Sequence, residues 1–210
     1  MAATAVAAGS LVAVPATAAS AAGTPPAPAP ARASASASAS DIIAPIGVDY
    51  ATWRHDVAAV VAEARPWIGA RTASAGDEKQ AMVLDVDNTS LETSFHPFWE
   101  QPTPAVADVR DLVRYASSRG VAVFFVTARP GIVRSLTEWN LEEDGYPVDG
   151  LYTASLSDLF EVSAYKTETR AEIEAKGYTI IANVGNSATD LSGGHAERTF
   201  KLPDYGGKLF

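Results

Sequence analysis

The fold follows from residues 82–91, MVLDVDNTSL, in which an apolar run meets two carboxylates. The segment 82–86 is short and apolar, so we interpret it as a buried strand that carries Asp85 near its end. Asp87 comes shortly after it in the chain. Charges at the end of an apolar strand are costly to desolvate unless a cation or hydrogen bonds compensate. The pair therefore predicts a ligand site or, as the simpler alternative, a cap on a helix or turn.

Two further apolar runs and one mixed segment predict the other strands of a sheet. Residues 121–126 are continuously apolar, as in a parallel strand that helices cover on both faces, and we expect them in the interior of the sheet. Residues 178–184 are interpreted as another buried strand. Residues 198–202 are expected to form a last strand at the edge.

Helical spacing of apolar residues predicts four helices, at 49–65, 104–119, 131–144 and 163–176. The first should have Asp49 as its N-cap and end at Pro66. The second should have Thr103 as its N-cap and Pro104 at its first helical position. Strands that alternate with helices specify an α/β fold, with an open, mostly parallel sheet and helices on both faces.

Polar residues follow two other predicted strands and join the two carboxylates at one edge of the sheet, where ligands of such folds bind. They are Thr127, Arg129, Asn186 and Asp190. Lys166 lies in the first turn of the predicted helix at 163–176, where an anion nearby would explain a cation. A threonine hydroxyl and an arginine after a strand suit an oxyanion. Each has a simpler interpretation, because Thr commonly ends strands, Lys166 could be a solvated surface residue, and Asn186 could cap a helix.

Four segments, DVDNTSL, FFVTARP, AYKTETR and VGNSATDL, resemble in order and type the four signatures of the haloacid dehalogenase (HAD) superfamily. They look most like subfamily IIIB, the secreted class B and plant-type acid phosphatases. The resemblance covers about residues 48–205 and implies a Rossmann-like HAD fold. It also implies an enzyme that hydrolyses small phosphomonoesters.

The resemblance assigns a role to each polar residue at the strand ends. Asp85 would be the nucleophile that forms an aspartyl-phosphate, and Asp87 would be the acid and then the base. The phosphate-binding residues would be Thr127, Arg129 and Lys166. The Mg²⁺ ligands would be Asp85, Asp87 through its backbone carbonyl, Asn186 and Asp190.

Asn186 departs from the family pattern, in which aspartate is common at this position. An amide oxygen contributes no formal charge to a cation, so Asn186→Asp is expected to tighten Mg²⁺. The departure also leaves open a binding or storage protein that keeps the fold without catalysis. A phosphotransferase that passes the phosphoryl group to an alcohol would use the same residues.

The predicted loops and helices fill the stretches between the signatures, so we expect no large cap domain. The nearest cover for the site is an aromatic loop containing Phe95, His96, Phe98 and Trp99. The favoured interpretation is a local hydrophobic plug. The alternative is that this loop stacks on an aromatic or nucleoside leaving group.

Composition limits the partners. The 210-residue chain has a formal net charge of −9 and a sequence pI near 4.8, which would repel a nucleic-acid backbone. It contains no cysteine, so thiolate metal sites and cysteine nucleophiles are excluded. A homo-oligomer is possible, because a neighbouring subunit could cover an open cleft.

The first forty residues differ in composition from the rest of the chain. Residues 1–22 are interpreted as a signal peptide, with an A-x-A cleavage pattern ending at Ala18, although a positive charge near the start is missing. Residues 23–40 should be a disordered Ala/Ser/Pro linker, and 41–210 the HAD-like phosphatase domain. The alternative is an alanine-rich tail without a targeting role. Export would make the protein extracellular, with no stable membrane insertion after processing.

We predict that the exported protein lacks about the first 18 residues, because signal peptidases cleave after small residues in this pattern. Mass spectrometry of the N-terminal peptide from culture medium and from cytosol checks this. An intact N-terminus on protein confined to the cytosol would contradict it.

Overall fold

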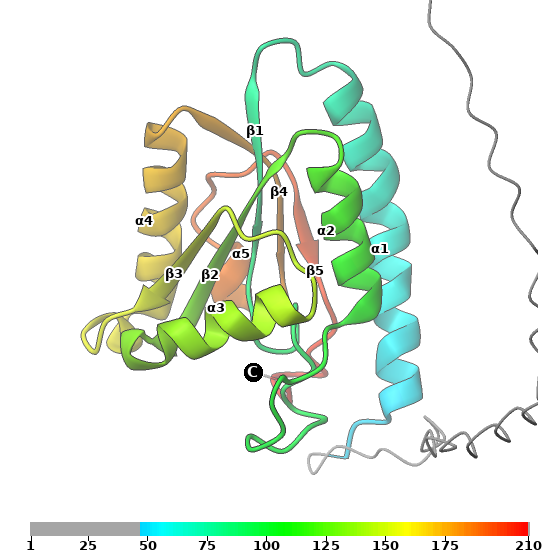
Figure 1. Cartoon of the computed structure of the whole chain (residues 1–210), viewed down its shortest axis with the longest axis vertical. Helices are drawn as coiled ribbons and strands as arrows, with labels where there is room; N and C mark the ends of the chain where they lie inside the picture. The colour runs from blue at the N-terminus through cyan, green and yellow to red at the C-terminus, as the bar shows by residue number, and fades with distance from the viewer. Residues whose placement is uncertain (1–46, 210) are drawn as a thin grey trace, which may run out of the picture. The chain divides into compact units, whose positions relative to one another are not determined.

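A computed structural model describes residues 47–209 and shows a five-stranded sheet in the order β3-β2-β1-β4-β5 (Figure 1). All neighbouring strands are parallel. The strands are β1 (Lys79–Leu84), β2 (Ala122–Pro130), β3 (Gly150–Ala154), β4 (Tyr178–Gly185) and β5 (Thr199–Lys201). The helices are α1 (Tyr50–Ala73), α2 (Ala107–Ser117), α3 (Arg134–Glu143), α4 (Val162–Ala175) and α5 (Ala188–Leu191), with 3₁₀ turns η2 (Gly131–Val133) and η3 (Asp158–Phe160). The predicted α/β class is confirmed.

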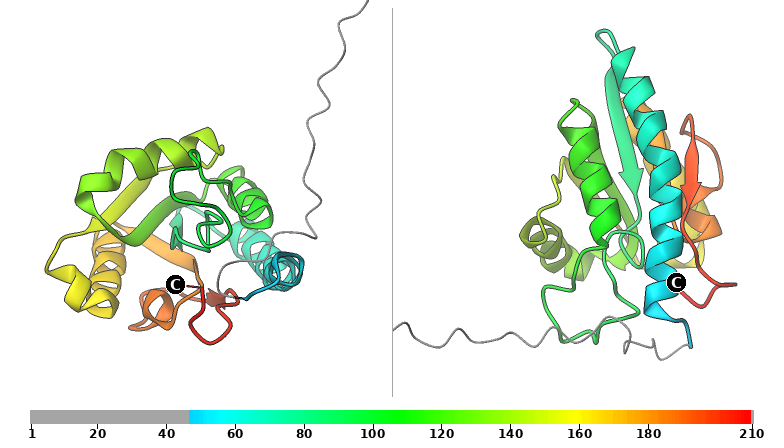
Figure 2. Two further views of the ribbon diagram at one scale, coloured as in Figure 1. Left: turned by 90° about the horizontal axis from the view of Figure 1, so that it is seen from below. Right: turned by 90° about the vertical axis from the view of Figure 1, so that its right-hand side faces the viewer.

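Helices cover both faces of the sheet, and β1 shows this residue by residue. Met82 and Leu84 belong to the larger core cluster, which includes residues of α1 and α2. Ala81 and Val83 point the other way, into a smaller cluster beneath α4 that includes Ile173. Figures 1 and 2 show α1 and α2 side by side on one flank and α4 on the opposite one. Both faces are apolar, which explains why the strands lack alternation.

The prediction that α1 ends at Pro66 is wrong, because the helix continues through this proline to Ala73. Proline removes one backbone hydrogen bond, but burial of the second half of the helix offsets that loss. Ile68 is fully buried. The Trp67 indole N–H donates to the carbonyl of Ile181 on β4 at 2.8 Å. The predicted N-cap at Asp49 is confirmed.

The predicted start of α2 is also wrong, because the helix begins at Ala107 and Thr103 does not cap it. The Pro104 carbonyl accepts a hydrogen bond from the Glu92 N–H at 2.9 Å, which holds this stretch against the loop after β1. The Thr103 N–H donates to the Asn140 side chain on α3. These long-range hydrogen bonds hold residues 103 and 104 outside the helix, so α2 begins about one turn later than predicted.

The sheet has one strand that the sequence pattern did not reveal. β3 is a short edge strand in which Leu151 and Ala154 are buried. The predicted edge strand at 198–202 is confirmed as β5, and the run at 121–126 forms the interior strand β2. β2 extends further than expected, with a register shift between Thr127 and Pro130.

The described residues contain no helix that is long and apolar enough to cross a bilayer. The segments interpreted as a signal peptide (1–22) and a linker (23–40) lie outside the described residues. Both therefore stay predictions.

We predict that Trp53→Ala lowers the free energy of unfolding by about 3–5 kcal/mol, the usual cost of removing a large buried aromatic side chain. Trp53 is fully buried and stacks on Phe95 at a centroid distance of 4.5 Å. Urea denaturation measures the change. The control Trp99→Ala removes a side chain that is 73% exposed and should change stability by about 0.5 kcal/mol or less. Equal losses would contradict the assignment.

Candidate active site

The DVDNT turn begins where β1 ends and brings two carboxylates to the same edge of the sheet. The Asp85 N–H still donates to Val184 of β4 at 3.0 Å, so this residue keeps the register of the sheet. The chain then folds back, and the N–H groups of Ser90 and Leu91 both donate to the Val86 carbonyl. Asn88 takes the left-handed conformation at the bend, with φ of 54°.

Lys166 joins Asp85 to Asp190 at the centre of the site. Its Nζ lies 2.6 Å from Oδ1 of each carboxylate. The side chains are only 4%, 8% and 4% exposed for Lys166, Asp85 and Asp190. Asp85 directly follows β1, Lys166 lies on α4 and Asp190 lies on α5, so three of the predicted site residues do lie together.

Two buried carboxylates face a single ammonium in this cluster. Burial raises the pKa of Asp85, against the opposing effect of Lys166, and the neighbouring carboxylates Asp190 and Asp87 raise it further. Burial alone would lower the pKa of Lys166, but the two carboxylates reverse the direction and raise it. The cluster has an excess of negative charge that a further cation would relieve.

Asp87 forms a separate ion pair with Arg129. The guanidinium contacts the carboxylate through Nη2 at 2.7 Å and Nε at 3.0 Å, and its Nη1 donates to Thr137. Arg129 thus orients Asp87 in this structure. Its predicted role as a phosphate ligand stays a prediction. Thr127, also expected to bind phosphate, is fully buried, and its Oγ1 accepts the Arg129 N–H at 3.1 Å.

The loop after β4 places Asp190 by local hydrogen bonds. Ser187 and Asp190 form a capping box at the start of α5, and the Ser187 N–H donates to the Asp190 carboxylate at 2.7 Å. Gly185 is required here because a side chain at 185 would collide with Asp190. The Asn186 side chain is also buried, with Oδ1 3.3 Å from the Thr89 hydroxyl.

Arg170 is a residue of the site that the sequence interpretation missed. It lies one turn after Lys166 on α4 and is only 1% exposed. Its guanidinium donates to the backbone carbonyls of Asp190 at 2.7 Å and Gly194 at 3.0 Å, and also to that of Ser192. The four-residue spacing from Lys166 was the available signal, because it places both cations on the same side of the helix.

The aromatic loop divides into a plug and an exposed part. Phe95 is buried against Trp53, as the plug interpretation predicts. Phe98 is 84% exposed and instead lines a cavity beside Asp87. His96 lies between two carboxylates, with Nε2 3.4 Å from Glu92 and Nδ1 3.1 Å from Glu100.

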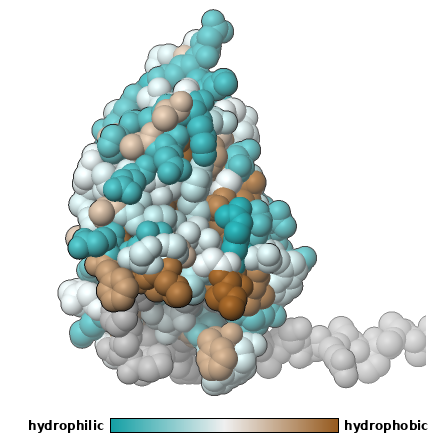
Figure 3. Space-filling model, turned by 90° about the vertical axis from the view of Figure 1, so that its left-hand side faces the viewer, coloured by the Kyte–Doolittle hydropathy of each residue, from teal (hydrophilic) through white to brown (hydrophobic). Residues whose placement is uncertain are grey.

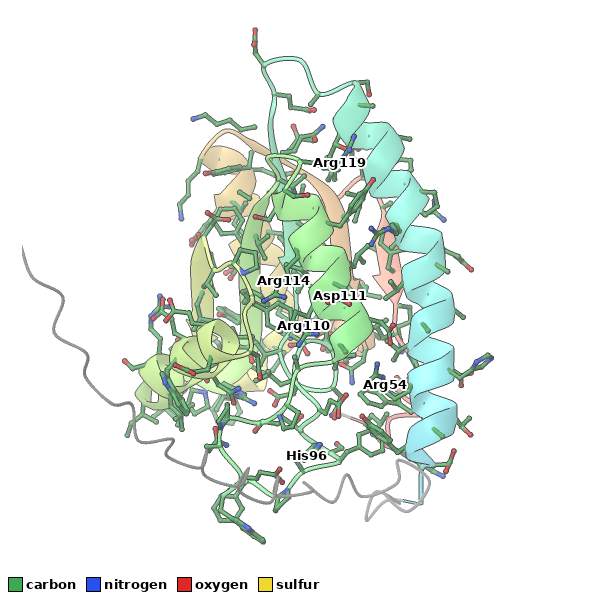
Figure 4. The ribbon with its side chains drawn as sticks, turned by 45° about the vertical axis from the view of Figure 1, so that its right-hand side comes forward. Arg54, His96, Arg110, Asp111, Arg114 and Arg119 are labelled. Atoms are coloured by element: carbon green, nitrogen blue, oxygen red, sulfur yellow. The ribbon has the colours of Figure 1, made fainter. Side chains whose placement is uncertain are left out.

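Figure 4 shows His96 below Arg54, which reaches from α1 towards the same loop. Arg54 forms an ion pair with Glu92 at 3.1 Å, and Glu92 is buried. The loop is therefore held against α1 by the Arg54–Glu92 ion pair as well as by the packing of Phe95 on Trp53.

Two cavities are lined in part by the carboxylates of the site. One of about 220 Å³ is lined by residues that include Asp85, Lys166, Asn186 and Asp190. The other, of about 310 Å³, is lined by polar and apolar residues that include Asp87, Phe98, Arg129, Val133 and Leu136. Asp87 borders both, which places it between the smaller cavity and the larger one.

The donor set fits a hard divalent cation. Within residues 47–209, no group of three or more Asp, Glu, His or Cys side chains is arranged to hold a metal. The set here has two carboxylates, on Asp85 and Asp190, and the amide oxygen of Asn186 lines the same cavity. Carboxylate and amide oxygens are the ligands that Mg²⁺ takes in proteins. The uncompensated charge at Asp85 favours such an ion.

A parallel sheet with paired acids after its first strand and a buried Lys–Asp pair beside them defines a HAD-type protein. Residues 31–208 match the family described as HAD superfamily, subfamily IIIB (acid phosphatase). The chain belongs to this family. A stem 28 kDa glycoprotein of Glycine max is 32% identical over 106 residues, which are 48% of this chain and 42% of that protein. The chain thus spans less than half the length of this relative.

Solved structures show the same fold. The class C acid phosphatase from Bacillus anthracis aligns with a TM-score of 0.60 and 17% identity over 73% of this chain and 78% of that one. The same enzyme with tungstate bound aligns with a TM-score of 0.59 and 16% identity, over the same shares. At these identities the likeness concerns the fold alone.

We predict that Arg170→Met lowers the free energy of unfolding by about 1.5–3 kcal/mol, the usual value for hydrogen bonds made by a charged group. Chemical denaturation measures it. The control Arg110→Met removes a half-exposed arginine whose ion pair with Asp111 is long, at 3.4 Å, and should cost about 0.5 kcal/mol or less. A loss at Arg170 no greater than at Arg110 would show that the loop after α5 does not need the guanidinium.

Proposed function

We propose that this protein hydrolyses phosphomonoesters with Asp85 as the nucleophile. The observation that carries the proposal is the Lys166 ammonium held 2.6 Å from both Asp85 and Asp190, beside the Asp87–Arg129 pair. In this arrangement Asp85 would serve as nucleophile, Lys166 as the cation for phosphoryl oxygens and Asp87 as the proton-transfer group, all at one edge of the sheet. Membership of subfamily IIIB supports the reaction class.

The reaction would proceed in two displacements. A carboxylate oxygen of Asp85 attacks phosphorus, the ester P–O bond breaks, and Asp87 gives its proton to the departing oxygen. Asp87 then takes a proton from water, which attacks the aspartyl-phosphate and releases inorganic phosphate and the free Asp85 carboxylate. The Lys166 ammonium and the Thr127 hydroxyl would bind the phosphoryl oxygens, and Arg129 would keep Asp87 directed at the leaving group.

Mg²⁺ would be held by Asp85, Asp190, the Asn186 amide and the backbone carbonyl of Asp87. When bound, it would neutralise charge on the phosphoryl group. The buried carboxylates of Asp85 and Asp190 share one ammonium, that of Lys166, so a divalent cation beside them would supply further positive charge.

The leaving group would occupy the cavity beside Asp87. Phe98, Val133 and Leu136 give this cavity an apolar wall, while Gln101 and Thr103 provide polar groups. The site should therefore favour esters of flat or apolar alcohols over esters of small polar ones. For Phe98 this preference agrees with the alternative interpretation of the aromatic loop, in which the loop contacts the leaving group. Phe95 instead agrees with the interpretation of a hydrophobic plug.

Phosphoryl transfer to an alcohol is the second candidate. The open, partly apolar cavity beside Asp87 could admit an alcohol in place of water. Product analysis with added alcohol separates the two activities. A storage protein on the same fold is less well supported, because the nucleophile, the acid and the lysine are all present and in contact with partners.

Secretion and self-association remain parts of the proposal. Nucleic acid is not an expected partner, given the net charge of −9. Figure 3 shows apolar side chains gathered in the lower part of the face that carries α4. Exposed apolar residues near this end of the sheet include Ile132, Leu156 and Phe160. Such exposure is compatible with a homo-oligomer, which light scattering would detect.

We predict that Asp85→Asn and Asp87→Asn differ in their dependence on the leaving group. Asp85→Asn should abolish turnover of every ester, because an amide is a poor nucleophile. Asp87→Asn should slow the first step with alkyl phosphates by roughly 10²–10⁴-fold, the contribution of general acid–base catalysis. It should slow the first step much less with an activated aryl phosphate, whose leaving group needs no proton.

Single-turnover phosphorylation is the measurement, because Asp87 also serves the second step and its loss would slow steady-state turnover of all substrates. Equal losses on alkyl and aryl esters in the first step would show that Asp87 is not the acid.

A further inference from the structure

The segment from Leu202 to Leu209, which follows β5, folds back against the loop that carries Asn186 (Figure 1). Leu202 and Leu209 are both fully buried in the larger core cluster. The Leu202 N–H donates to Gly185 at 2.9 Å, and the Tyr205 hydroxyl donates to Asp56 on α1 at 2.7 Å. The segment is thus anchored to the end of β4 and to α1.

A further contact of this segment fixes the orientation of the Asn186 side-chain amide. Its Nδ2 donates to the backbone carbonyl of Leu209 at 2.7 Å. A carbonyl oxygen only accepts hydrogen bonds, so the nitrogen of the amide must face Leu209. The amide oxygen therefore faces away from Leu209 and accepts from the Thr89 hydroxyl, and Asn186 lines the cavity that Asp85 also lines.

Burial makes this contact obligatory. Asn186 is 2% exposed, so water cannot readily replace either partner of its amide. An unpaired buried donor is costly. A carboxylate at the same position would have no hydrogen to donate and would place an oxygen against the Leu209 carbonyl. This contact opposes the expectation, drawn from charge alone, that Asn186→Asp tightens Mg²⁺.

We propose that Leu209 is a positioning residue of the active site, whose backbone carbonyl aims the Asn186 amide oxygen at the divalent cation. Asn186 and the Leu202–Leu209 segment then depend on each other. An amide is favoured over a carboxylate at position 186 because only the amide can donate a hydrogen bond to the Leu209 carbonyl. The inference rests on the metal site of the proposed function.

A double-mutant cycle tests the coupling, with Mn²⁺ binding measured directly by electron paramagnetic resonance on metal-depleted protein. The four proteins are the full chain, the chain ended after Gly207, the full chain with Asn186→Asp, and the chain that combines both changes. A substitution at 209 keeps the carbonyl, so only shortening removes it.

Shortening should weaken Mn²⁺ binding by roughly 10–100-fold in the chain with asparagine, the usual effect of losing the partner that orients a ligand. Combined with Asn186→Asp, shortening should leave the affinity unchanged or tighten it, because the opposing carbonyl has gone. Equal weakening in both backgrounds, or no weakening in the first, would overturn the proposal.

General destabilisation needs a matched control, because shortening also removes a buried leucine. Leu202→Ala removes a buried leucine from the same segment and leaves the Leu209 carbonyl in place. It should lower the melting temperature of the metal-free protein as shortening does, but leave Mn²⁺ affinity within about threefold of the full chain, well below a positioning partner's effect. An equal loss of affinity in Leu202→Ala would refute a specific role for Leu209. Failure of the unaltered full chain to bind Mn²⁺ at all would instead refute the proposed metal site.

Discussion

The structure depends on one buried contact, in which the Lys166 ammonium lies between the carboxylates of Asp85 and Asp190. Breaking such a contact by removing one partner leaves an uncompensated charge in the interior, at a cost of several kcal/mol. The end of β1, α4 and α5 must therefore meet at this point. Gly185 allows the close approach of Asp190, and Arg170 holds the backbone of Asp190.

The same contact explains why the site suits catalysis better than stability. Two carboxylates share one ammonium, and burial raises the pKa of Asp85. Hydrophobic residues in these positions would satisfy the fold at lower electrostatic cost. Under the proposed function, the two carboxylates would bind a divalent cation and, together with Lys166, a phosphate dianion. The Asp87–Arg129 pair lies outside this buried cluster and lines the cavity beside Phe98, where Asp87 would meet the leaving group.

Local patterns predicted most of the fold and indicated Asp85, Thr127 and Asp190 as candidate site residues, because these residues lie at or after apolar strands. They did not predict which groups pair. Arg129 contacts Asp87, and Asn186 contacts Leu209, through chain folding that no short segment encodes. The errors at Pro66 and Thr103 have the same origin, since tertiary burial and long-range hydrogen bonds override local helix signals. The short strand β3 gave too little pattern to detect.

The most direct test of the central claim, that Asp85 is the nucleophile, is chemical trapping of the phosphorylated protein. Borohydride reduces an acyl phosphate to an alcohol and converts the aspartate that carried it into homoserine. The protein is mixed with an aryl phosphate, quenched in acid, reduced, digested and analysed by mass spectrometry. The account predicts homoserine at position 85 and unmodified aspartate at positions 87 and 190. Homoserine at either of those positions, or turnover with no trapped residue, would contradict it.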